Sequence, residues 1–352
     1  MKAVVLCAGE GTRMRPLTHF QPKHLIPVGN KPVVEWVLGA ISSAMISTAV
    51  VVVSPSTELA FREALGDGAG FGIELSYIVQ KEPRGLAHAV ACAEGYVAKE
   101  PFLLYLGDNL FEMGIRELVD AFRNGNCSAA ISLVQVEDPR RFGVACLEAG
   151  RIVRLVEKPE HPPSDMAVAG AYVFDSRIFD AIRRIRPSAR GELEITDAIQ
   201  VLIDDRLLVL PHRVEGWWKD VGRPRDLLIA NQLLAEQLER SIGGRIDASS
   251  AVEGKVVIGA ETVVERSTIA GPAVIGSGVR IRNAAIGPNV SLGDGCVVED
   301  CSVENSILMD RAHVSGVARV GNSILGRDAV LSKTSSGSHV ALLVGDHCIA
   351  QL

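Results

Sequence analysis

A glycine-rich loop that carries two arginines follows the first apolar run of this chain. The residues from Met1 to Leu6 lead into the sequence CAGEGTRMRP at positions 7–16. Glycines at positions 9 and 11 allow backbone N–H groups to approach an anion closely. Arg13 and Arg15 add permanently charged forks for phosphate oxygens, and Lys23 follows in the sequence QPKHLIP. The pattern predicts a phosphate-binding loop.

This loop differs from the two common phosphate-binding fingerprints. It lacks the Gly-Lys-Ser/Thr ending of a P-loop, and Met14 stands where a dinucleotide-binding motif has its third glycine. A G-x-G sequence after a strand is also compatible with a tight turn that binds nothing. Arginines beside a glycine turn need an anionic partner, and Glu10 is the nearest carboxylate in the sequence. The two arginines and Lys23 therefore favour phosphate binding.

Two aspartates stand in turns beside apolar segments and are candidates to hold a divalent cation. Asp108 follows the apolar run Phe102–Leu106, and Asp220 lies within the sequence WKDVG. Phosphoryl chemistry favours a cation held by carboxylates, since the transferred group carries negative charge over several oxygens. Aspartate beside glycine is also a common turn former, so each aspartate alone is ambiguous.

These motifs together closely resemble those of the sugar-phosphate nucleotidyltransferases. The resemblance rests on G-E-G-T-R-M-R-P-L-T at positions 9–18 and P-K-H-L-I-P at positions 22–27, and matching segments extend along most of the chain. Enzymes of this family join a nucleoside triphosphate to a sugar 1-phosphate and release pyrophosphate. Within the family, the chain is most similar to the long form of the glucose-1-phosphate thymidylyltransferases, which ends in a β-helix.

The resemblance implies a role for each matched residue of the nucleotide and metal sites. Arg13 would bind the phosphates that leave as pyrophosphate, Lys23 would neutralise charge at the α-phosphate, and Asp108 with Asp220 would hold Mg²⁺. These four residues are the catalytic candidates. The nucleotide site implied by the motifs consists of Leu6, Ala8, Gly9, Gly11, Thr12, Arg13, Gln80, Pro83, Gly85 and Asp108.

The segment QKEPRGLA at positions 80–87 is the candidate reader of the base. A glutamine amide can pair with both N3–H and a carbonyl group of uracil or thymine, so Gln80 is suited to dTTP or UTP. Gly85 would let the backbone approach the same edge of the base. The alternative is a polar turn that opens a helix at Leu86.

The resemblance also implies a site for a sugar 1-phosphate, expected to be glucose 1-phosphate. Glu157 would bind sugar hydroxyls, while Lys158 and Arg190 would reach the sugar phosphate. Glu194 and Asp197, in the same RGELEITD segment as Arg190, have the alternative role of capping the helix that follows. The full sugar-phosphate set implied by the motifs is Lys23, Gly143, Glu157, Lys158, Val168, Gly170, Arg190 and Trp218.

Three positions depart from the well-known short enzymes of the family. His24 stands where glutamine is common, Phe142 replaces a frequent tyrosine, and Val221 replaces the usual threonine after the metal aspartate. These differences bear on the choice of sugar more than on the reaction. The implied reaction is an in-line attack that needs no nucleophilic side chain, so positioning and charge neutralisation would account for catalysis.

The elements that must position these residues alternate between strand and helix up to about residue 240. Apolar, β-branched runs at 3–6, 48–53, 73–79, 102–106 and 129–136 alternate with helical patterns at 33–44, 57–65, 86–94 and 115–123. Such alternation predicts an α/β domain, and the resemblance implies a mostly parallel, Rossmann-like nucleotidyltransferase sheet. The first loop, Gln80–Arg84 and Gly107–Asn109 should converge beyond the carboxyl ends of its strands, where ligands bind.

After Gly243 and Gly244 the pattern changes to recurring aliphatic–glycine pairs, at 258–259, 275–276, 286–287, 292–293, 320–321 and 325–326. Spacings near multiples of six favour a hexapeptide-repeat parallel β-helix, with a loose β-sandwich as the alternative. The resemblance implies the left-handed form. We therefore expect a nucleotidyltransferase domain over 1–240 and a β-helix domain over 245–352. The exposed edges of a β-helix also predict a homo-oligomer.

Composition restricts the classes of partner. A net charge of −6 without a basic stripe argues against nucleic acid as a partner. The seven cysteines form no C-x-x-C motif, which favours free thiols in a reducing cytosol and predicts a cytoplasmic protein. No apolar stretch is long enough to cross a membrane, and the N-terminal run is too short for a signal peptide, so no membrane partner is expected.

Three other functions remain open. The enzyme could transfer uridylyl groups or use another sugar 1-phosphate. It could be bifunctional, with a β-helix that acetylates an amino sugar, although His313 and His339 stand isolated in the sequence. It could also be a non-catalytic regulatory subunit, but such relatives tend to lose the arginine of G-T-R or a metal aspartate, and this chain keeps Arg13 and both aspartates.

Overall fold

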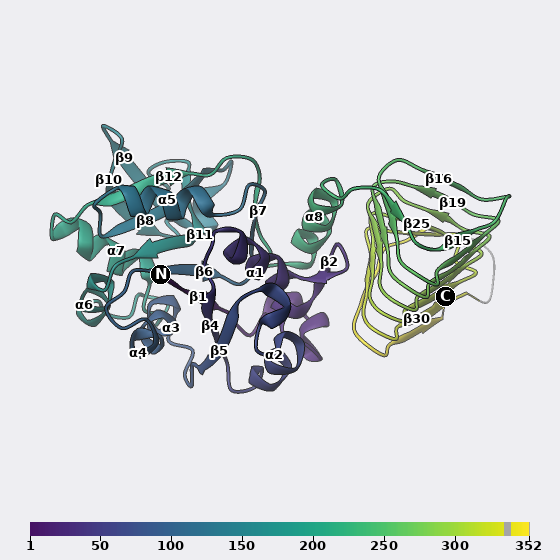
Figure 1. Ribbon diagram of the computed structural model, residues 1–352, viewed down its shortest axis with the longest axis horizontal. Coiled ribbons are helices and arrows are strands. Elements are labelled where there is room, and N and C mark those ends of the chain that lie inside the picture. The colour runs from purple at the N-terminus through teal and green to yellow at the C-terminus, as the bar shows by residue number, and fades with distance from the viewer. Residues whose placement is uncertain (334–338, 352) are drawn as a thin grey trace. The chain divides into compact units, whose positions relative to one another are not determined.

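The computed structural model describes residues 1–333 and 339–351 (Figure 1). The chain divides into two compact units that do not follow a single cut in the sequence. The first unit consists of Met1–Glu10 and Val34–Asp220, and the second of Gly11–Val33 and Val221–Leu352. The predicted phosphate-binding segment is therefore divided, because Gly11 and the residues after it group with the C-terminal part. A domain boundary at residues 240–245 stays a prediction.

The first unit is built on a mixed nine-stranded sheet. Its parallel half has the order β6-β1-β4-β5, with strands at Phe102–Leu106, Lys2–Leu6, Thr48–Val53 and Glu74–Val79. β1, β4 and β6 are almost wholly buried and mostly aliphatic, as parallel strands covered on both faces must be, whereas the edge strand β5 is only partly buried. Because the strands are parallel, the segments that follow β1, β5 and β6 leave from the same edge of the sheet, as the sequence predicted.

The other half of this sheet is largely antiparallel. The long strand β11 (Met166–Phe174) runs antiparallel to β6 and also pairs with β8 and β9. The remaining strands are β8 (Ala129–Gln135), β9 (Gly143–Glu148), β10 (Arg151–Glu157) and β12 (Val209–Arg213). A separate two-stranded ribbon joins β7 (Asn109–Phe111) to β13 (Trp218–Asp220). The sheet is thus Rossmann-like in its first strands and mixed as a whole.

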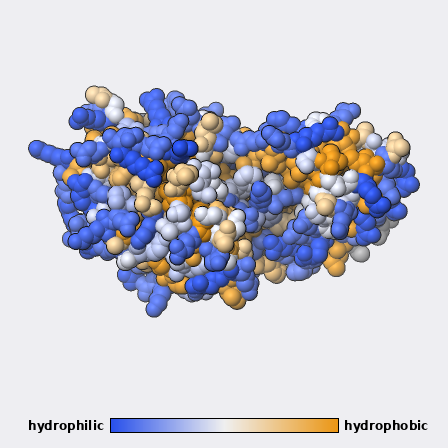
Figure 2. Space-filling view, in the orientation of Figure 1, coloured by the Kyte–Doolittle hydropathy of each residue, from blue (hydrophilic) through white to orange (hydrophobic). Residues whose placement is uncertain are grey.

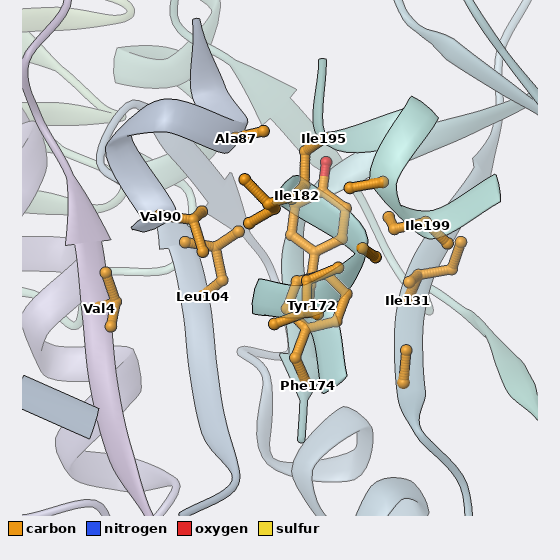
Figure 3. Close-up of a cluster of buried hydrophobic side chains, with 14 of the residues drawn as sticks. Val4, Ala87, Val90, Leu104, Ile131, Tyr172, Phe174, Ile182, Ile195 and Ile199 are labelled. Carbon is orange, nitrogen blue, oxygen red and sulfur yellow. The ribbon is translucent and has the colours of Figure 1, made fainter. Parts of the chain in front are cut away.

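Helices cover this sheet and complete its core (Figure 3). Val90 of α3, Ile182 of α6 and Ile199 of α7 surround Tyr172 and Phe174 of β11, and all five are buried. Each such side chain contributes about 1.5–3 kcal/mol when it leaves water. The helices of the first unit are α1 (Val33–Ser43), α2 (Glu58–Leu65), α3 (Leu86–Cys92), α4 (Glu94–Val97), α5 (Arg116–Asn124), α6 (Arg177–Arg184) and α7 (Ile195–Asp204), with 3-10 turns η4 (Ala69–Phe71) and η5 (Pro139–Arg141).

The second unit is dominated by a parallel β-helix made of three sheets, consistent with the expected left-handed form. The loose β-sandwich considered from the sequence is therefore wrong. One sheet contains β14 (Ser241–Ile242), β17 (Val256–Ile258), β20 (Ala273–Ile275), β23 (Val290–Leu292), β26 (Ile307–Leu308), β29 (Ile324–Leu325) and β32 (Leu343–Val344). The second contains β15 (Arg245–Ile246), β18 (Val263–Glu265), β21 (Arg280–Arg282), β24 (Val297–Glu299), β27 (His313–Ser315), β30 (Val330–Ser332) and β33 (Ile349–Gln351). The third contains β16 (Ala251–Glu253), β19 (Thr268–Ala270), β22 (Ala285–Ile286), β25 (Ser302–Glu304), β28 (Arg319–Gly321) and β31 (His339–Val340).

Most coils of this β-helix are slightly shorter than three full hexapeptides. The register partners Val256 and Ala273 stand at equivalent positions of neighbouring coils, and the same offset recurs in the other two sheets. One coil is shorter still, where Ser291 pairs with Ile307. In these shorter coils, the three hexapeptides together lack one or two residues. This shortening explains why the aliphatic–glycine spacings only approximate multiples of six.

Left-handed backbone conformations turn the chain at the corners. Asn283 and Asp300 occupy the same corner in successive coils, with φ of 48° and 53°. Asparagine and aspartate tolerate this region better than other residues with a β-carbon. Their side chains form a ladder, in which Arg266 Nε donates to Asn283 Oδ1 at 2.6 Å and Asn283 Nδ2 donates to Asp300 Oδ1 at 2.8 Å.

The rest of the second unit consists of helix α8 and the segment 11–33. Helix α8 spans Pro224–Ala235. The segment contains three 3-10 turns and a hairpin, namely η1 (Thr12–Met14), η2 (Leu17–His19), η3 (Lys23–Leu25), β2 (Pro27–Val28) and β3 (Lys31–Pro32). Among the residues that the structure describes, no helix is long and apolar enough to cross a membrane. Hydrophilic side chains cover much of the face drawn in Figure 2, with a hydrophobic patch over the β-helix.

Candidate functional site

The β7–β13 ribbon brings the two candidate metal aspartates together. Asp220, the last residue of β13, is the register partner of Asn109, which directly follows Asp108. Residues that face each other in an antiparallel ladder have Cα atoms about 4.5–5.5 Å apart, so the two carboxylates start from neighbouring positions. Both aspartates are partly accessible to solvent. The proximity of these two residues, which are distant in the sequence, is a result of the tertiary structure.

Asn109 organises this ribbon, and the sequence analysis gave it no role. Its side chain is only 2% exposed, and its Nδ2 donates to Asp108 Oδ1 at 2.9 Å. Its Oδ1 accepts from the Trp218 Nε1 at 2.7 Å and from the Gly170 backbone N–H at 3.1 Å. The amide therefore fixes the orientation of one candidate metal ligand. The only sign of this role in the sequence was that a polar residue directly follows Asp108.

Two protein carboxylates are enough to hold a magnesium ion. Mg²⁺ commonly keeps several waters and takes only one or two carboxylates from the protein, with substrate phosphates as further ligands. Within the described ranges, no cluster of three or more His, Cys, Asp and Glu residues could hold a metal ion. The donor set of Asp108 and Asp220 fits an oxygen-ligated cation that is shared with phosphates.

The candidate base reader Gln80 is buried, with its side-chain amide held in place. It directly follows β5, and its Nε2 donates to the Gly85 carbonyl at 3.3 Å. The same nitrogen lies 2.9 Å from His88 Nδ1, which accepts this bond in the tautomer that carries its proton on Nε2. The sequence analysis missed His88, which orients the amide from within α3. Pro83 lies in the exposed part of the same loop.

The base-reading loop is bonded to the segment that precedes α7. Leu193 N donates to the Arg84 carbonyl at 2.7 Å, and Ala87 N donates to the Leu193 carbonyl at 3.0 Å. Between these bonds Gly85 adopts φ of +102°, and a β-carbon there would lie 2.6 Å from the Leu193 oxygen. Gly85 is thus required for this close approach. The structure therefore joins the candidate base reader to the RGELEITD motif.

Cations and a carboxylate gather at the candidate sugar site. Glu157, the last residue of β10, accepts from the Thr196 hydroxyl at 3.0 Å. Lys158 Nζ lies 3.2 Å from one Glu157 oxygen, and Arg190 Nη2 lies 3.8 Å from the same oxygen. Gly143 faces this group, because a β-carbon there would be 2.6 Å from a Thr196 methyl carbon. The structure thus brings together Gly143, Glu157, Lys158 and Arg190, four residues that the resemblance had assigned to sugar-phosphate binding.

Glu194 positions Arg190 and does not cap α7. Its side chain is 2% exposed and accepts from Ser188 Oγ at 2.8 Å and from Arg190 Nη2 at 2.8 Å, and it occupies the N-cap position without a capping bond. The alternative capping role is therefore wrong for this residue. Asp197 lies in the first turn of α7, and burial together with the charges of Glu194 and Glu157 raises the pKa of its carboxyl group.

Strand β11 and an aromatic contact link the residues of the candidate sugar site to the β7–β13 ribbon. Gly170 of β11 bonds to Asn109, and Val168, two residues earlier, packs against Gly143. The rings of Phe142 and Trp218 meet edge to face with centroids 5.1 Å apart. Phenylalanine at 142 thus packs on the ribbon through its ring alone.

The N-terminal loop begins in the first unit and continues in the second. Leu6 is buried at the end of β1, and its carbonyl accepts from Gly107 N at 3.0 Å, which ties the residues before Ala8 and Gly9 to the segment that carries Asp108. From Gly11 onward, with Thr12, the loop belongs to the second unit. The meeting of its cations with the aspartates therefore stays a prediction.

Within the second unit, Gly11 brings the two parts of the loop together. Its φ is +64°, and a β-carbon there would lie 3.1 Å from Lys23 Cβ and 3.0 Å from a methyl carbon of Thr18. The Thr18 hydroxyl also donates to the Gly11 carbonyl at 2.8 Å. Arg13 is exposed in η1, two residues from this contact. The structure thus brings the predicted phosphate-binding cations Arg13 and Lys23 onto one folded loop.

Comparisons with known proteins identify the family of this chain. A family model described as nucleotidyl transferase matches residues 2–237, and one described as the GMPPB C-terminal domain matches residues 269–349. A glucose-1-phosphate thymidylyltransferase of Streptomyces antibioticus is 44% identical over 99% of this chain and 98% of its own length. The low-salt glycan biosynthesis nucleotidyltransferase Agl11 of Haloferax volcanii is 44% identical over 73% of this chain and 72% of its own length.

A solved structure gives the same result for the fold. The crystal structure of a putative glucose-1-phosphate thymidylyltransferase from Bacillus anthracis, in complex with a sucrose, superposes with a TM-score of 0.64. It is 35% identical and covers 69% of this chain and 98% of its own. With the match to the family model over residues 2–237, these likenesses show that the chain belongs to the nucleotidyl transferase family.

Proposed function

We propose that this protein transfers a thymidylyl group from dTTP to glucose 1-phosphate, giving dTDP-glucose and pyrophosphate. The observation that carries the proposal is the Asp108–Asp220 ribbon, held by Asn109 and joined through β11 to the cluster around Glu157. This arrangement provides a cation-binding pair of carboxylates next to a site with positive charge for a second phosphate. Sugar 1-phosphate nucleotidyl transfer needs both features.

The proposed reaction joins the two substrates without a covalent enzyme intermediate. A phosphate oxygen of the sugar 1-phosphate attacks the α-phosphorus of the nucleotide, and the bond from that phosphorus to the bridging oxygen of the β-phosphate breaks. Pyrophosphate takes the electron pair and leaves opposite the attacking oxygen. Asp108 and Asp220 would hold Mg²⁺, whose positive charge would stabilise the phosphate oxygens. Arg13 and Lys23 add charge on the nucleotide side, and the protein otherwise positions the reactants.

The cluster around Glu157 suits the sugar 1-phosphate. Lys158 and Arg190 both lie within 4 Å of Glu157, so two cations border one carboxylate. We assign the cations to the sugar phosphate and the carboxylate to the sugar hydroxyls, because a carboxylate accepts hydrogen bonds that hydroxyls donate. Glu194 holds Arg190 in place for this role.

The Gln80 amide supports a pyrimidine nucleotide. Its Nε2 is engaged with Gly85 and His88, which leaves its Oε1 as the natural acceptor for N3–H of thymine or uracil. Thymine and uracil differ by one methyl group, and a methyl in an apolar pocket changes binding by about 1–3 kcal/mol. The similarity to a thymidylyltransferase over nearly the full chain supports dTTP as the preferred substrate, with UTP as the alternative.

The test is pyrophosphate release with Mg²⁺ and glucose 1-phosphate, measured separately with dTTP, UTP, CTP, GTP and ATP. We expect the highest kcat/KM with dTTP, a lower value with UTP, and little release with the purine nucleotides. An Asp108→Asn variant purified in the same way controls for contaminating enzymes. Preference for a purine nucleotide would contradict the role of Gln80, and no release with any nucleotide would contradict the choice of glucose 1-phosphate.

A further inference from the structure

The segment 11–33, which carries Arg13 and Lys23, is bonded to α8 at Gly29 and to the β-helix at Asn30, although these parts are far apart in the sequence. We propose that the β-helix and α8 position this loop for catalysis, with Asn30 and Asn231 as the positioning residues. This inference rests on the proposed function, because it gives the loop that carries Arg13 and Lys23 its catalytic importance.

The first attachment is made by the β2–β3 hairpin. Its turn residues Gly29 and Asn30 both have left-handed backbone conformations, with φ of 56° and 59°. Asn30 Nδ2 donates to the Leu292 carbonyl of β23 at 2.6 Å and lies 3.4 Å from the Val274 carbonyl of β20. The side chain at the tip of the hairpin therefore spans two neighbouring coils of the β-helix.

Asn231 makes the second attachment from α8. Its side chain is fully buried, and its Oδ1 accepts from the Gly29 backbone N–H at 2.8 Å and from Ser291 Oγ at 2.6 Å. Its Nδ2 lies 3.4 Å from the Asn289 carbonyl. One buried amide of α8 thus bonds to both the β2–β3 hairpin and strand β23 of the β-helix. A buried polar group with fitted partners specifies a single arrangement, because any slip would leave donors unpaired.

The middle of the segment contacts later coils. Gln21 Nε2 lies 3.4 Å from the sulfur of Met309, which directly follows β26. A β-carbon at Gly345, after β32, would lie 3.4 Å from Cε2 of Phe20. The Phe20 ring also meets the His347 ring edge to face, with centroids 6.3 Å apart.

These contacts follow the order of strands in one sheet of the β-helix. From Asn30 back to Phe20, the segment meets residues on or next to β20, β23, β26 and β32, which lie in this order along that sheet with β29 between the last two. The loop therefore lies along the axis of the β-helix and rests on several coils. Lys23 lies between the two groups of contacts, and Arg13 precedes them, so the position of both cations is coupled to the coils.

The test compares three single variants of the full-length protein. Asn30→Gly removes the amide that bonds to Leu292 while glycine keeps the left-handed turn available. Asn231→Ala removes the buried link to Gly29. Asn283→Gly is the matched control, because Asn283 has the same residue type and a left-handed φ of 48°, and it bonds to Asp300 in a corner away from the loop.

We expect kcat to fall about tenfold or more in Asn30→Gly and Asn231→Ala, since a misplacement of about 1 Å can cost 10²-fold. The ratio of kcat/KM for dTTP to that for UTP should not change, because Gln80 lies outside the loop. Hydrogen–deuterium exchange of the amides in residues 11–33 should accelerate in both variants. The control should retain wild-type turnover and wild-type exchange in these residues.

Each outcome bears on the proposal. A kcat within twofold of wild type in Asn30→Gly would overturn it, and so would a lower kcat without faster exchange in residues 11–33. An equal effect of Asn283→Gly would show general destabilisation of the β-helix and would also overturn it. If wild type releases no pyrophosphate with any nucleotide, the proposed function fails, whereas the exchange comparison still reports whether the asparagines hold the loop. If Asn231→Ala does not fold, Asn30→Gly decides the test.

Discussion

At the scale of single residues, the candidate site depends on polar side chains that orient charged or base-reading groups. Asn109 holds Asp108, and His88 with Gly85 holds Gln80. Glu194 does the same for Arg190 through a charge-assisted bond. Functional side chains held this way lose little freedom when substrates bind, which lowers the cost of reaching the reactive arrangement.

Replacement of Asp108 by asparagine tests the proposed metal ligand. The variant keeps the size of the side chain but loses its charge, so cation-assisted stabilisation of the phosphates should be lost. This stabilisation is worth several kcal/mol, and we expect kcat to fall about 10³-fold. Steady-state pyrophosphate release gives kcat, and a melting temperature within a few degrees of wild type shows that the fold is intact. Normal turnover would eliminate Asp108 as a metal ligand.

Replacement of Gln80 by alanine tests the base reader. Loss of hydrogen bonds in a buried site should cost about 1–3 kcal/mol, so kcat/KM for dTTP should fall about 10–100-fold. The preference for dTTP over purine nucleotides should shrink as well. Gln135→Ala is the matched control, since Gln135 is an exposed glutamine bonded to Asp165. An unchanged nucleotide preference in Gln80→Ala would mean that another residue selects the base.

At the scale of elements, short segments at the ends of strands hold most of the proposed site in the first unit. The β7–β13 ribbon sets the two aspartates, and the loop after β5 is bonded to the start of α7. Strand β11 connects these groups, because Gly170 contacts Asn109 while Val168 packs on Gly143. The core of buried aliphatic and aromatic residues in Figure 3 keeps β11 and α7 in this relation.

Replacement of Gly170 by alanine tests the contact between β11 and the ribbon. The new β-carbon would lie 2.5 Å from Asn109 Cγ, so the asparagine must move and Asp108 with it. We expect kcat to fall about 10²-fold, since small misplacements are costly in catalysis, and stability to fall by about 1–3 kcal/mol.

Gly39→Ala is the matched control for this substitution. Gly39 lies in α1, and a β-carbon there would meet no atom within 4 Å. Alanine in a helix is favoured over glycine by about 0.5–1 kcal/mol, so this variant should be slightly more stable and fully active. Turnover and urea denaturation of both variants provide the comparison. Wild-type turnover in Gly170→Ala would exclude a strict requirement for the Asn109 position.

At the scale of the whole molecule, the two compact units are interleaved along the chain. The chain leaves the first unit after Glu10, returns to it at Val34 and leaves again after Asp220. The proposed catalytic groups are therefore divided between units, with Arg13 and Lys23 on the β-helix unit. A homo-oligomer remains a prediction of the sequence, and Leu343 and Ile349 on late coils of the β-helix are apolar and exposed.

The buried thiols of the β-helix predict how its stability depends on pH. Burial raises the pKa of the Cys296 thiol and of the Cys301 thiol to about 12. An unfolded thiol ionises near pH 8.5, so the unfolded state gains charge at a lower pH than the folded state. The stabilisation is complete below about pH 8.5 and is lost as the pH rises toward 12.

We expect the free energy of unfolding to fall between about pH 9 and 11, with a shallower slope in Cys296→Ala and Cys301→Ala variants. Urea denaturation monitored by circular dichroism at several pH values measures this slope. Cys348→Ala is the control, because Cys348 is exposed and should leave the slope unchanged. Equal slopes in all four proteins would show that the buried thiols do not contribute.

The sequence by itself determined the elements and the chemical types of the candidate residues. Strands at 48–53 and 102–106 coincide with β4 and β6, and the aliphatic–glycine pairs favoured the β-helix over a β-sandwich. These features are local, because side-chain periodicity and glycine-rich turns act over a few residues. The same locality made the motifs recognisable around Gly11, Asp108 and Glu157.

Only the tertiary structure decided which of these residues meet. Asp220 pairs with Asn109, the residue after Asp108, and Glu194 bonds to Arg190 without capping α7. Most coils of the β-helix are shorter than three full hexapeptides. The tertiary structure also placed the hairpin with Asn30 on coils that follow much later in the sequence. Hydrogen bonds between distant segments depend on how whole elements pack, and local propensity contains no information about that packing.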